Sequence, residues 1–366
     1  MKNFFVDYHV LQTVPPSCIN RDDTGSPKAA VYGGVTRARV SSQSWKRAIK
    51  LMFKELLEEE RLGVRTLELG DYVADHIRKL EADIKKPEKL AEEVLKAAGI
   101  PLKDGKAKAL FLISDRQAQR LAEAALRLQS GDGEREKKKK GDDELKAILR
   151  DTPSIDMALF GRMVADDASL NYDAACQVAH SISTHAVRNE YDYFTAVDEY
   201  KSSEDAGAGH INTTEFNSAT FYRYATLNLY ELYCGLKNES DILDAVSVFT
   251  KAFLCSMPTG HQNSFANRTV PDLAYITVRR DQPVNMAGAF EEPVKAKNGE
   301  GYVLLSEMRL MDYAEKMYGT FVDKPERAFG IGRLDRLKEM AEVSSLKSVS
   351  ESLLEEVRGY LGEWRK

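Results

Sequence analysis

Basic side chains are concentrated near the start of the 366-residue sequence, where they could neutralise the phosphates of a nucleic acid. Between Arg21 and Lys54 there are eight basic and two acidic side chains, a local charge of +6, although the whole chain carries −5. The basic residues are Arg21, Lys28, Arg37, Arg39, Lys46, Arg47, Lys50 and Lys54. Because phosphates are met by a local patch, the overall charge does not exclude nucleic-acid binding.

Polar groups beside these cations could add hydrogen bonds to the same ligand. Ser41, Ser42 and Gln43 precede an apolar periodic segment and offer hydroxyl, amide and backbone N–H donors at a helix start. Gly33 and Gly34 would let a backbone approach closely. The segment has no G-K-[ST] motif of a nucleotide-binding loop, so a solvated basic face without a ligand is an equal alternative.

Candidate catalytic residues are few. Asp22 and Asp23 lie in a polar loop, where a carboxylate could hold a metal ion, but salt bridging or capping is the simpler role. His180 and His185 are five residues apart and match no metal-ligand spacing, so we expect both to be structural. No serine or cysteine nucleophile motif occurs. We therefore expect no enzymatic activity, no cofactor and no metal site.

The elements that must position the basic segment follow from its periodicity. Residues from Phe4 to Leu11 alternate as in a strand, which Val14-Pro-Pro-Ser17 should end. A second extended segment, Lys28–Val40, should point Arg37 and Arg39 outward. A helix beginning at Gln43 or Ser44 should bury an apolar stripe and expose its lysines. This order suits a ferredoxin-like or RRM-like unit.

The remaining chain predicts an α+β fold with two additions. From about Thr66 to Arg150 the composition favours short helices, followed by a polar, lysine-containing loop at 131–143. Ala175–Val187 and Phe216–Leu229 read as long strands, and the connection between them predicts a projecting hairpin. Helices are expected at Ile242–Met257 and within Leu337–Trp364, and a strand at Leu273–Val278.

The amino-acid composition limits the class of protein to which the chain can belong. Hydrophobic residues make up 43% of the chain and charged residues 30%, as in ordinary globular proteins. No apolar run approaches the roughly 18 residues of a membrane span, and the start lacks the pattern of a signal peptide. The four cysteines are scattered, which favours reduced thiols. We expect a cytoplasmic protein with no membrane partner.

Several sequence stretches resemble one known family. The run PSCINRDDTGSPKAAVYGGVTRARVSSQSWKRA is similar to the N-terminal signature of the backbone subunit of the type I-E CRISPR surveillance complex, Cascade, in the RAMP superfamily. Further stretches agree in order up to about residue 300: IDMALFGRM, VAHSISTHAV, DYFTAVDEY, EFNSATFYRYATLNL and NMAGAFEEPVKAKNGEG. The helical insertion and the C-terminal segment match poorly.

The resemblance implies a hand-like architecture. It consists of an RRM-like palm, a helical insertion called the fingers and a β-hairpin thumb. On this sequence the palm would comprise residues 1–65, 151–187 and 216–366, the last with closing helices. The fingers would be 66–150 and the thumb 188–215.

The resemblance also implies site residues. Positions that contact guide phosphates in the family are Lys28, Ser41, Gln43, Lys46 and Lys50, with Arg21 and Arg47 beside them. Met163 matches an apolar wedge against a base, although a core methionine is the simpler interpretation. Tyr193, Phe194 and Thr195 fall where the thumb presses on a kinked nucleotide; relatives often have tryptophan at the position of Tyr193. Relatives place a DNA-gripping lysine patch near Lys137, Lys138, Lys139 and Lys140.

The implied function is antiviral and non-catalytic. Copies would stack head to tail along the guide RNA (crRNA) as a helical filament, kink it at intervals and present it to target DNA beside other Cascade subunits. Base pairing would read the sequence while the protein holds the backbone. Two alternatives stay open: a metal-dependent RNA endonuclease of the same superfamily that uses Asp22 or Asp23, and a generic basic RNA chaperone.

Overall fold

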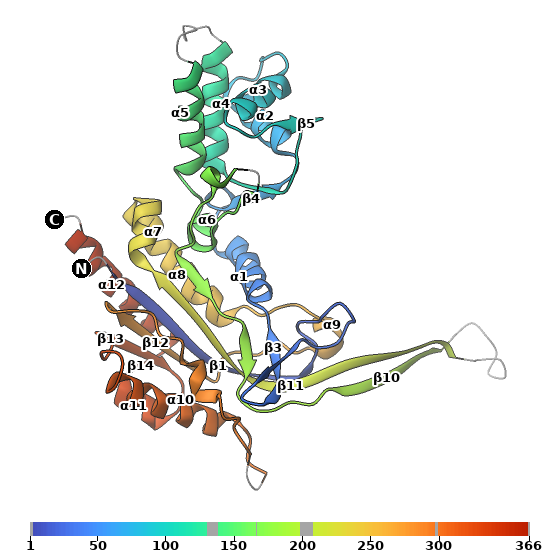
Figure 1. Cartoon of the computed structure of the whole chain (residues 1–366), viewed down its shortest axis with the longest axis vertical. Helices are drawn as coiled ribbons and strands as arrows, with labels where there is room; N and C mark the ends of the chain where they lie inside the picture. Colours follow the sequence, from blue (N-terminus) through green and yellow to red (C-terminus); the bar gives the residue numbers. More distant parts are fainter. Residues whose placement is uncertain (1–2, 130–137, 166, 198–207, 297–298, 365–366) are drawn as a thin grey trace. The chain divides into compact units, whose positions relative to one another are not determined.

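The chain divides into two compact units, each assembled from separate parts of the sequence. The computed structural model describes residues 3–129, 138–165, 167–197, 208–296 and 299–364. The first unit comprises residues 1–52, 178–226 and 249–353, and the second comprises 53–177, 227–248 and 354–366. The fold is mixed α/β with one large central sheet (Figure 1).

The large sheet has the strand order β14-β13-β12-β1-β11-β9-β3-β2, with β8 and β10 pairing on β11. Neighbouring strands of this sheet run mostly antiparallel, whereas β13 and β14 pair in parallel. The strands are β1 (Phe5–Ser17), β2 (Ala29–Tyr32), β3 (Val35–Val40), β8 (Cys176–Val178), β9 (Ser181–Ser183), β10 (Glu190–Val197), β11 (Ala208–Asn228), β12 (Leu273–Arg279), β13 (Arg327–Ile331) and β14 (Glu342–Val343).

Strand β1 lies in the middle of this sheet and is covered on both faces. Tyr8 packs edge-on against Phe249 and Phe253 of helix α8 (Glu239–Cys255), at ring distances of 5.4 and 5.7 Å. On the other face, Leu11 belongs to an apolar cluster with Leu310 of helix α10 (Val303–Tyr318). Because both faces are buried, the strand carries apolar residues on each of them.

Several expected strand boundaries are wrong; β11 begins at Ala208 rather than Phe216, and Lys28–Val40 forms two strands, β2 and β3. Strand β1 continues through Pro15 and Pro16 to Ser17. Its pairing with β12 ends at Leu11, so the missing N–H of each proline interrupts no hydrogen bond to that strand. The expected long strand Ala175–Val187 is two short ones, β8 and β9. Both pair with β11, and β9 also pairs with β3.

Strands β10 and β11 form a long antiparallel hairpin that extends away from the sheet of the first unit (Figure 1). The register runs from Glu190 opposite Phe216 to Val197 opposite Ala208, with an irregularity after Ala196. Residues 198–207 lie outside the described part of the chain.

Helices dominate the second unit. Its helices are α2 (Leu69–Leu80), α3 (Pro87–Ala97), α4 (Asp115–Gln129), α5 (Lys138–Arg150), α6 (Ile155–Phe160) and α7 (Leu229–Leu236). Helices α2 to α5 enclose a core that includes Val73, Ile77, Leu95, Leu121 and Leu149. Two small antiparallel sheets accompany them: β4 (Gly63–Thr66) with β7 (Phe111–Ser114), and β5 (Leu102–Lys103) with β6 (Lys106–Ala107).

The remaining helices are α1 (Ser42–Leu56), α9 (Gln262–Phe265), α11 (Asp335–Met340) and α12 (Leu346–Trp364), with 3₁₀ turns at Glu59–Arg61, Ala168–Leu170 and Met286–Phe290. Within the described ranges, no helix combines the length and apolarity that a membrane crossing requires.

Candidate nucleic-acid interface

Asn20 joins the loop after β1 to the start of helix α1. Its carbonyl oxygen accepts the N–H of Lys28 at 2.8 Å, and its side-chain Oδ1 accepts the N–H of Ser41 at 2.9 Å. The carbonyl of Lys28 in turn accepts the N–H of Arg39 at 2.9 Å. The fold therefore places Arg21, Lys28 and the N-terminus of α1 on one surface, although they are about twenty residues apart in sequence.

Helix α1 starts one residue earlier than expected, at Ser42. Ser41 acts as its cap: its hydroxyl oxygen accepts the N–H of Ser44 at 3.3 Å, and the residue is buried. Trp45 and Ile49 are buried on the inner side of the helix, with the Trp45 indole N–H donating to the Ser181 hydroxyl at 2.9 Å. This anchoring fixes which face of α1 is presented to solvent.

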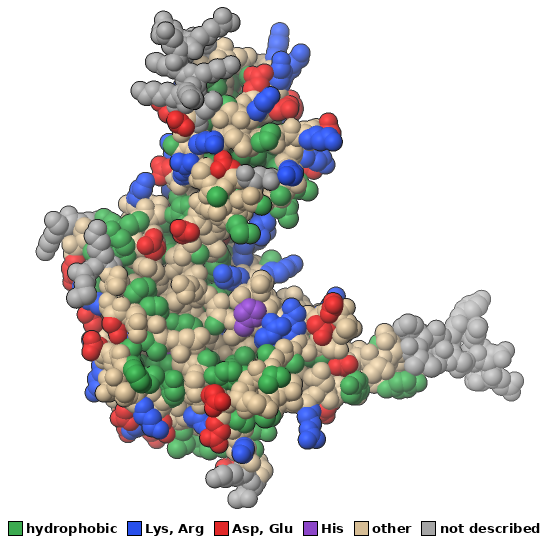
Figure 2. All heavy atoms as spheres, in the orientation of Figure 1, with side chains coloured by type: hydrophobic (Ala, Val, Ile, Leu, Met, Phe, Trp, Pro, Cys, Tyr) green, Lys and Arg blue, Asp and Glu red, His purple; other side chains and the backbone are tan. Residues whose placement is uncertain are grey.

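The outer face of α1 carries four of the predicted contact residues. Gln43 and Arg47 are exposed, while Lys46 and Lys50 are partly exposed. Spacings of three and four residues place side chains on one helix face, so these four form a continuous polar and cationic row. Together with Arg21 and Lys28 they make up what we call the basic strip. Figure 2 shows Lys and Arg side chains gathered beside a histidine on the face that it displays.

Arg37 does not belong to the basic strip, contrary to the expectation that it points outward. It is fully buried, and its guanidinium donates to the backbone carbonyls of Tyr32, Ser183, Phe290 and Glu291 at 2.8–3.2 Å. Burial lowers the pKa of Arg37. Its role is to tie the β2–β3 hairpin to the sheet and to the segment around Phe290.

Gly33 and Gly34 form the two-residue turn between β2 and β3. Both have positive φ, +59° and +76°, as a tight hairpin of this kind requires. A Cβ on Gly33 would lie 1.6 Å from the carbonyl oxygen of Glu291. The close backbone approach that these glycines permit is thus to the protein's own chain at Glu291.

Asp22 organises its own loop. Its Oδ1 accepts the N–H groups of Thr24 and Ser26 at 2.9 and 3.0 Å and the Thr24 hydroxyl at 2.7 Å. The hydrogen bond from the Thr24 side chain is the main cause that lowers the pKa of Asp22. Asp23 is exposed. Over the described ranges, no three His, Cys, Asp or Glu side chains gather as metal ligands would.

Two hollows border the basic strip, and sequence reasoning missed one of their walls. Gly260 and Ile19 line both hollows; Arg21 and His261 line the first, and Arg47 lines the second. A Cβ on Gly260 would lie 2.5 Å from the Ile19 carbonyl oxygen, so the close packing needs glycine. The glycine between Thr259 and His261 is typical of a turn, but the sequence does not indicate that this turn packs beside the basic strip.

The hairpin presents its predicted residues on two faces. Side chains alternate along a strand, so Tyr193 and Thr195 point to one face of β10 and Phe194 to the other. Opposite them on β11 lie Thr213, Ile211 and Asn212, respectively. Tyr193 and Phe194 are 63% and 42% exposed, so neither ring is packed inside the hairpin. Both rings are therefore accessible to a ligand.

Met163 is 85% exposed, which excludes a core methionine. It lies in the second unit, after helix α6, where Gly161 adopts a φ of +78°. Its neighbour Arg162 is buried and donates to the carbonyls of Leu112 and Leu170 at 3.1 and 3.0 Å. Anchoring Arg162 inward leaves Met163 on the surface.

The lysine run was expected in a loop, but part of it is helical. The backbone of Lys138, Lys139 and Lys140 forms the first turn of α5. Lys137 lies outside the described residues, as do the side chains of the other three.

The two candidate histidines differ. His185 is buried: its Nδ1 donates to the Ala186 carbonyl at 2.9 Å, its Nε2 accepts the Thr220 N–H at 3.2 Å, and its ring stacks on Tyr302 at 3.7 Å. Burial lowers its pKa. His180 is exposed, and its Nδ1 lies 3.0 Å from Nη1 of Arg39.

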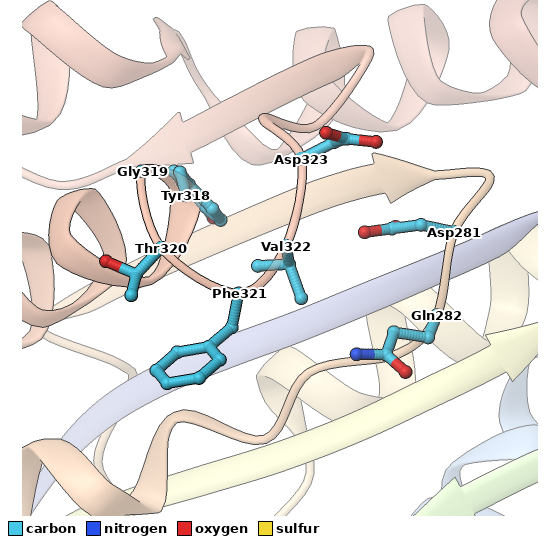
Figure 3. A pocket seen from close by; sticks show the side chains of 8 residues that line it. All are labelled: Asp281, Gln282, Tyr318, Gly319, Thr320, Phe321, Val322 and Asp323. Atoms are coloured by element: carbon cyan, nitrogen blue, oxygen red, sulfur yellow. The ribbon is translucent and has the colours of Figure 1, made fainter.

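A separate hollow of about 520 Å³ lies near β12, between Asp281–Gln282 and Tyr318–Asp323 (Figure 3). The buried Arg279 braces both walls: its Nε donates to Asp281 Oδ1 at 3.0 Å, and its Nη2 to the Asp323 carbonyl at 2.8 Å. The Asp281 carboxylate therefore neutralises a buried cation. In strand order this hollow is remote from β3 and the basic strip.

Comparison with known proteins gives matches along almost the entire chain. The family model described as CT1975-like protein matches residues 6–358. A chain of a solved "CRISPR RNA-guided surveillance complex, pre-nicking" is 33% identical, with a TM-score of 0.80, covering 96% of this chain and 100% of that one. A chain of a "CRISPR RNA-guided surveillance complex" is 29% identical, with a TM-score of 0.62 and coverages of 96% and 99%. A search of curated proteins found no match.

Proposed function

Because the chain belongs to the CT1975-like protein family and is a Cascade backbone-type Cas subunit, we propose that it is the non-catalytic backbone of a type I-E CRISPR complex that polymerises along crRNA. The observation that carries this proposal is the basic strip. Arg21, Lys28, Lys46, Arg47 and Lys50 share one surface of the first unit, and Asn20 holds their elements together. Such a row neutralises successive phosphates whatever the base sequence.

If several copies of the protein bind one RNA side by side, neighbouring copies must contact each other. A head-to-tail contact that does not close into a ring produces a helical filament, and a filament matches a linear ligand such as crRNA. Each copy would then hold the same number of nucleotides. Further copies of the chain and other Cascade subunits are the proposed protein partners.

The hairpin and Met163 are the proposed kinking elements. In this proposal the sheet of the first unit is an RRM-like palm, helices α2 to α5 are fingers and the β10–β11 hairpin is a thumb. Tyr193, Phe194 and Thr195 would press on one nucleotide of each repeat, and Met163 would contact a base as an apolar wedge. Their exposure supports this role, because side chains available for stacking must be free of internal packing.

Target DNA is the proposed second ligand. Lys138, Lys139 and Lys140 occupy the start of a helix, and a lysine cluster there would attract a phosphate backbone. The proposed setting is antiviral defence in the cytoplasm.

The proposed absence of catalysis is supported by the loop geometry. The Asp22 carboxylate accepts three hydrogen bonds from its own loop. This structural role explains why an aspartate occurs at this position without assigning it a catalytic role. Incubating the assembled complex with complementary RNA and Mg²⁺ tests this. Uncut target supports the proposal, whereas regular cuts that Asp22→Ala or Asp23→Ala abolishes would establish an endonuclease.

The nucleic acid that co-purifies with the protein tests the binding proposal. We expect repeat-derived RNAs of uniform length. Mixed cellular RNA without uniform length would instead indicate a generic chaperone.

A further inference from the structure

Arg39 and His180 lie beside Lys28 of the basic strip, on the β3–β9 part of the sheet. The backbone N–H of Arg39 bonds to the carbonyl of Lys28 at 2.9 Å. Arg39 Nη1 lies 3.0 Å from His180 Nδ1, and Arg39 Nε donates to the Ala29 carbonyl at 3.2 Å. His180 immediately precedes β9, whose Ile182 pairs with Arg39.

The contact with Arg39 determines the tautomer of His180. A guanidinium has only donors, so the imidazole Nδ1 must accept and carries no proton. Partial burial and the positive charges of Arg39 and Lys28 lower the pKa of His180, which favours the neutral ring. A neutral imidazole with a bare Nδ1 carries its proton on Nε2. His180 therefore offers an N–H donor from an exposed side chain.

Among the residues that the structure describes, this group of three side chains has no acidic ion-pair partner. In the described part of the chain, neither Lys28 nor Arg39 forms an ion pair with a carboxylate. The charges that act on His180 are those of Lys28 and Arg39, both positive. Cations that are held close together repel one another, and a bound anion offsets this repulsion.

We propose that His180, Arg39 and Lys28 form a phosphodiester-binding subsite in which His180 donates its Nε2–H to a phosphate oxygen of the guide RNA. This inference rests on the proposed function and extends it to two residues, Arg39 and His180, that lie outside the basic strip. Arg39 both attracts the phosphate and fixes the tautomer that can donate to it.

Two substitutions separate a donor from a structural anchor. His180→Asn keeps a short amide that can still meet Arg39 but removes the group at the Nε2 position. His180→Gln places an amide N–H near that position. Affinity of the full-length protein is measured by fluorescence anisotropy, with single-stranded RNA at low salt and with an oligonucleotide of the same sequence whose backbone is uncharged methylphosphonate.

We expect His180→Asn to weaken RNA binding roughly tenfold, as loss of a hydrogen bond to a charged group should. His180→Gln should stay within about twofold of the wild type, and neither change should affect the methylphosphonate oligonucleotide. Equal RNA affinity of wild type and His180→Asn would overturn the subsite, as would equal losses in both variants or a loss that persists on the uncharged backbone. A wild-type protein that binds neither oligonucleotide would instead contradict the proposed function.

Discussion

The cations near the N-terminus of the chain divide into a surface set and a core residue. Arg21, Arg47 and Lys54 are exposed, whereas Arg37 is fully enclosed by backbone carbonyls. In a sequence both kinds look alike, since an arginine on an alternating strand can point either way. The difference arises because carbonyl oxygens of its own hairpin and of two distant segments converge on Arg37.

Replacing Lys46 and Lys50 together by alanine should weaken guide binding equally for all sequences. Each lost phosphate contact should reduce the slope of log affinity against log salt by about 0.7 for single-stranded RNA. Titrations of two unrelated guides at several salt concentrations measure this. Sequence-selective loss, or an unchanged salt slope, would contradict a phosphate-holding role for these lysines. The double variant Lys324→Ala with Lys347→Ala, at two exposed lysines outside the basic strip, is the charge-matched control.

Glu307 should make stability depend on pH. Burial, and secondarily the charge of Asp272, raise its pKa from 4.5 to about 7. The folded protein thus holds this proton while the unfolded chain releases it, so stability falls as pH rises from about 4.5 to about 7. Glu307→Gln should remove that loss, raising stability relative to the wild type at pH 8 by at most about 3 kcal/mol. Thermal unfolding at pH 5 and pH 8 checks this.

The control for this prediction is Glu351→Gln, at an exposed position of α12. It should shift the melting temperature equally at both pH values. If Glu307→Gln behaved like Glu351→Gln, burial of the carboxyl group would not be the cause.

At the level of elements, the β2–β3 hairpin depends on its two glycines to different extents. Gly33→Ala combines a strained positive φ with a clash against the Glu291 carbonyl, whereas Gly34→Ala meets only the strain, since nothing lies within 4 Å of its added Cβ. Strain alone costs about 1–2 kcal/mol. Melting temperatures should therefore fall further for Gly33→Ala, and equal effects would show that the contact with Glu291 is unimportant.

The β10–β11 hairpin should affect the conformation of the guide RNA more than the affinity for it. Phe194→Ala removes one exposed ring and should loosen the kink, while affinity falls by no more than about 1–3 kcal/mol because phosphates supply most of it. Chemical probing of guide nucleotides in the assembled complex reports the kink. An unchanged probing pattern would remove Phe194 from that role.

Local signals predicted many elements well. The apolar stripe of α1, the α8 helix and strand β12 appear within a few residues of their expected bounds, because each has a strong period or a β-branched core. The end of the first strand was predicted less well. It depends on how far β1 pairs with a distant strand, β12, and local sequence does not encode that partner.

The same division applies to the candidate site. Residues of the basic strip were recognisable because they all fall in one stretch of the sequence that is rich in basic side chains and poor in acidic ones. The Thr259–His261 wall was not, because the fold brings it to Arg21 and Arg47 from more than two hundred residues away. His180 was interpreted as structural, and only its contact with Arg39 indicates another role.

At the scale of the whole molecule, the resemblance to Cascade backbone subunits is confirmed by the family match and by the solved structures. The sequence of the helical insertion and of the C-terminal segment matched the family poorly, yet the structural match covers 96% of the chain. Packing of helices α2 to α5 can be retained while their surface residues change, since a core constrains mainly its apolar positions.

The central claim is that each copy grips the same length of RNA through the basic strip. The direct test is the number of protein copies bound per guide, measured by native mass spectrometry on guides of increasing length. We expect the copy number to rise in equal steps, one copy for each fixed increment of nucleotides. A copy number that stays constant as the guide lengthens would contradict the account.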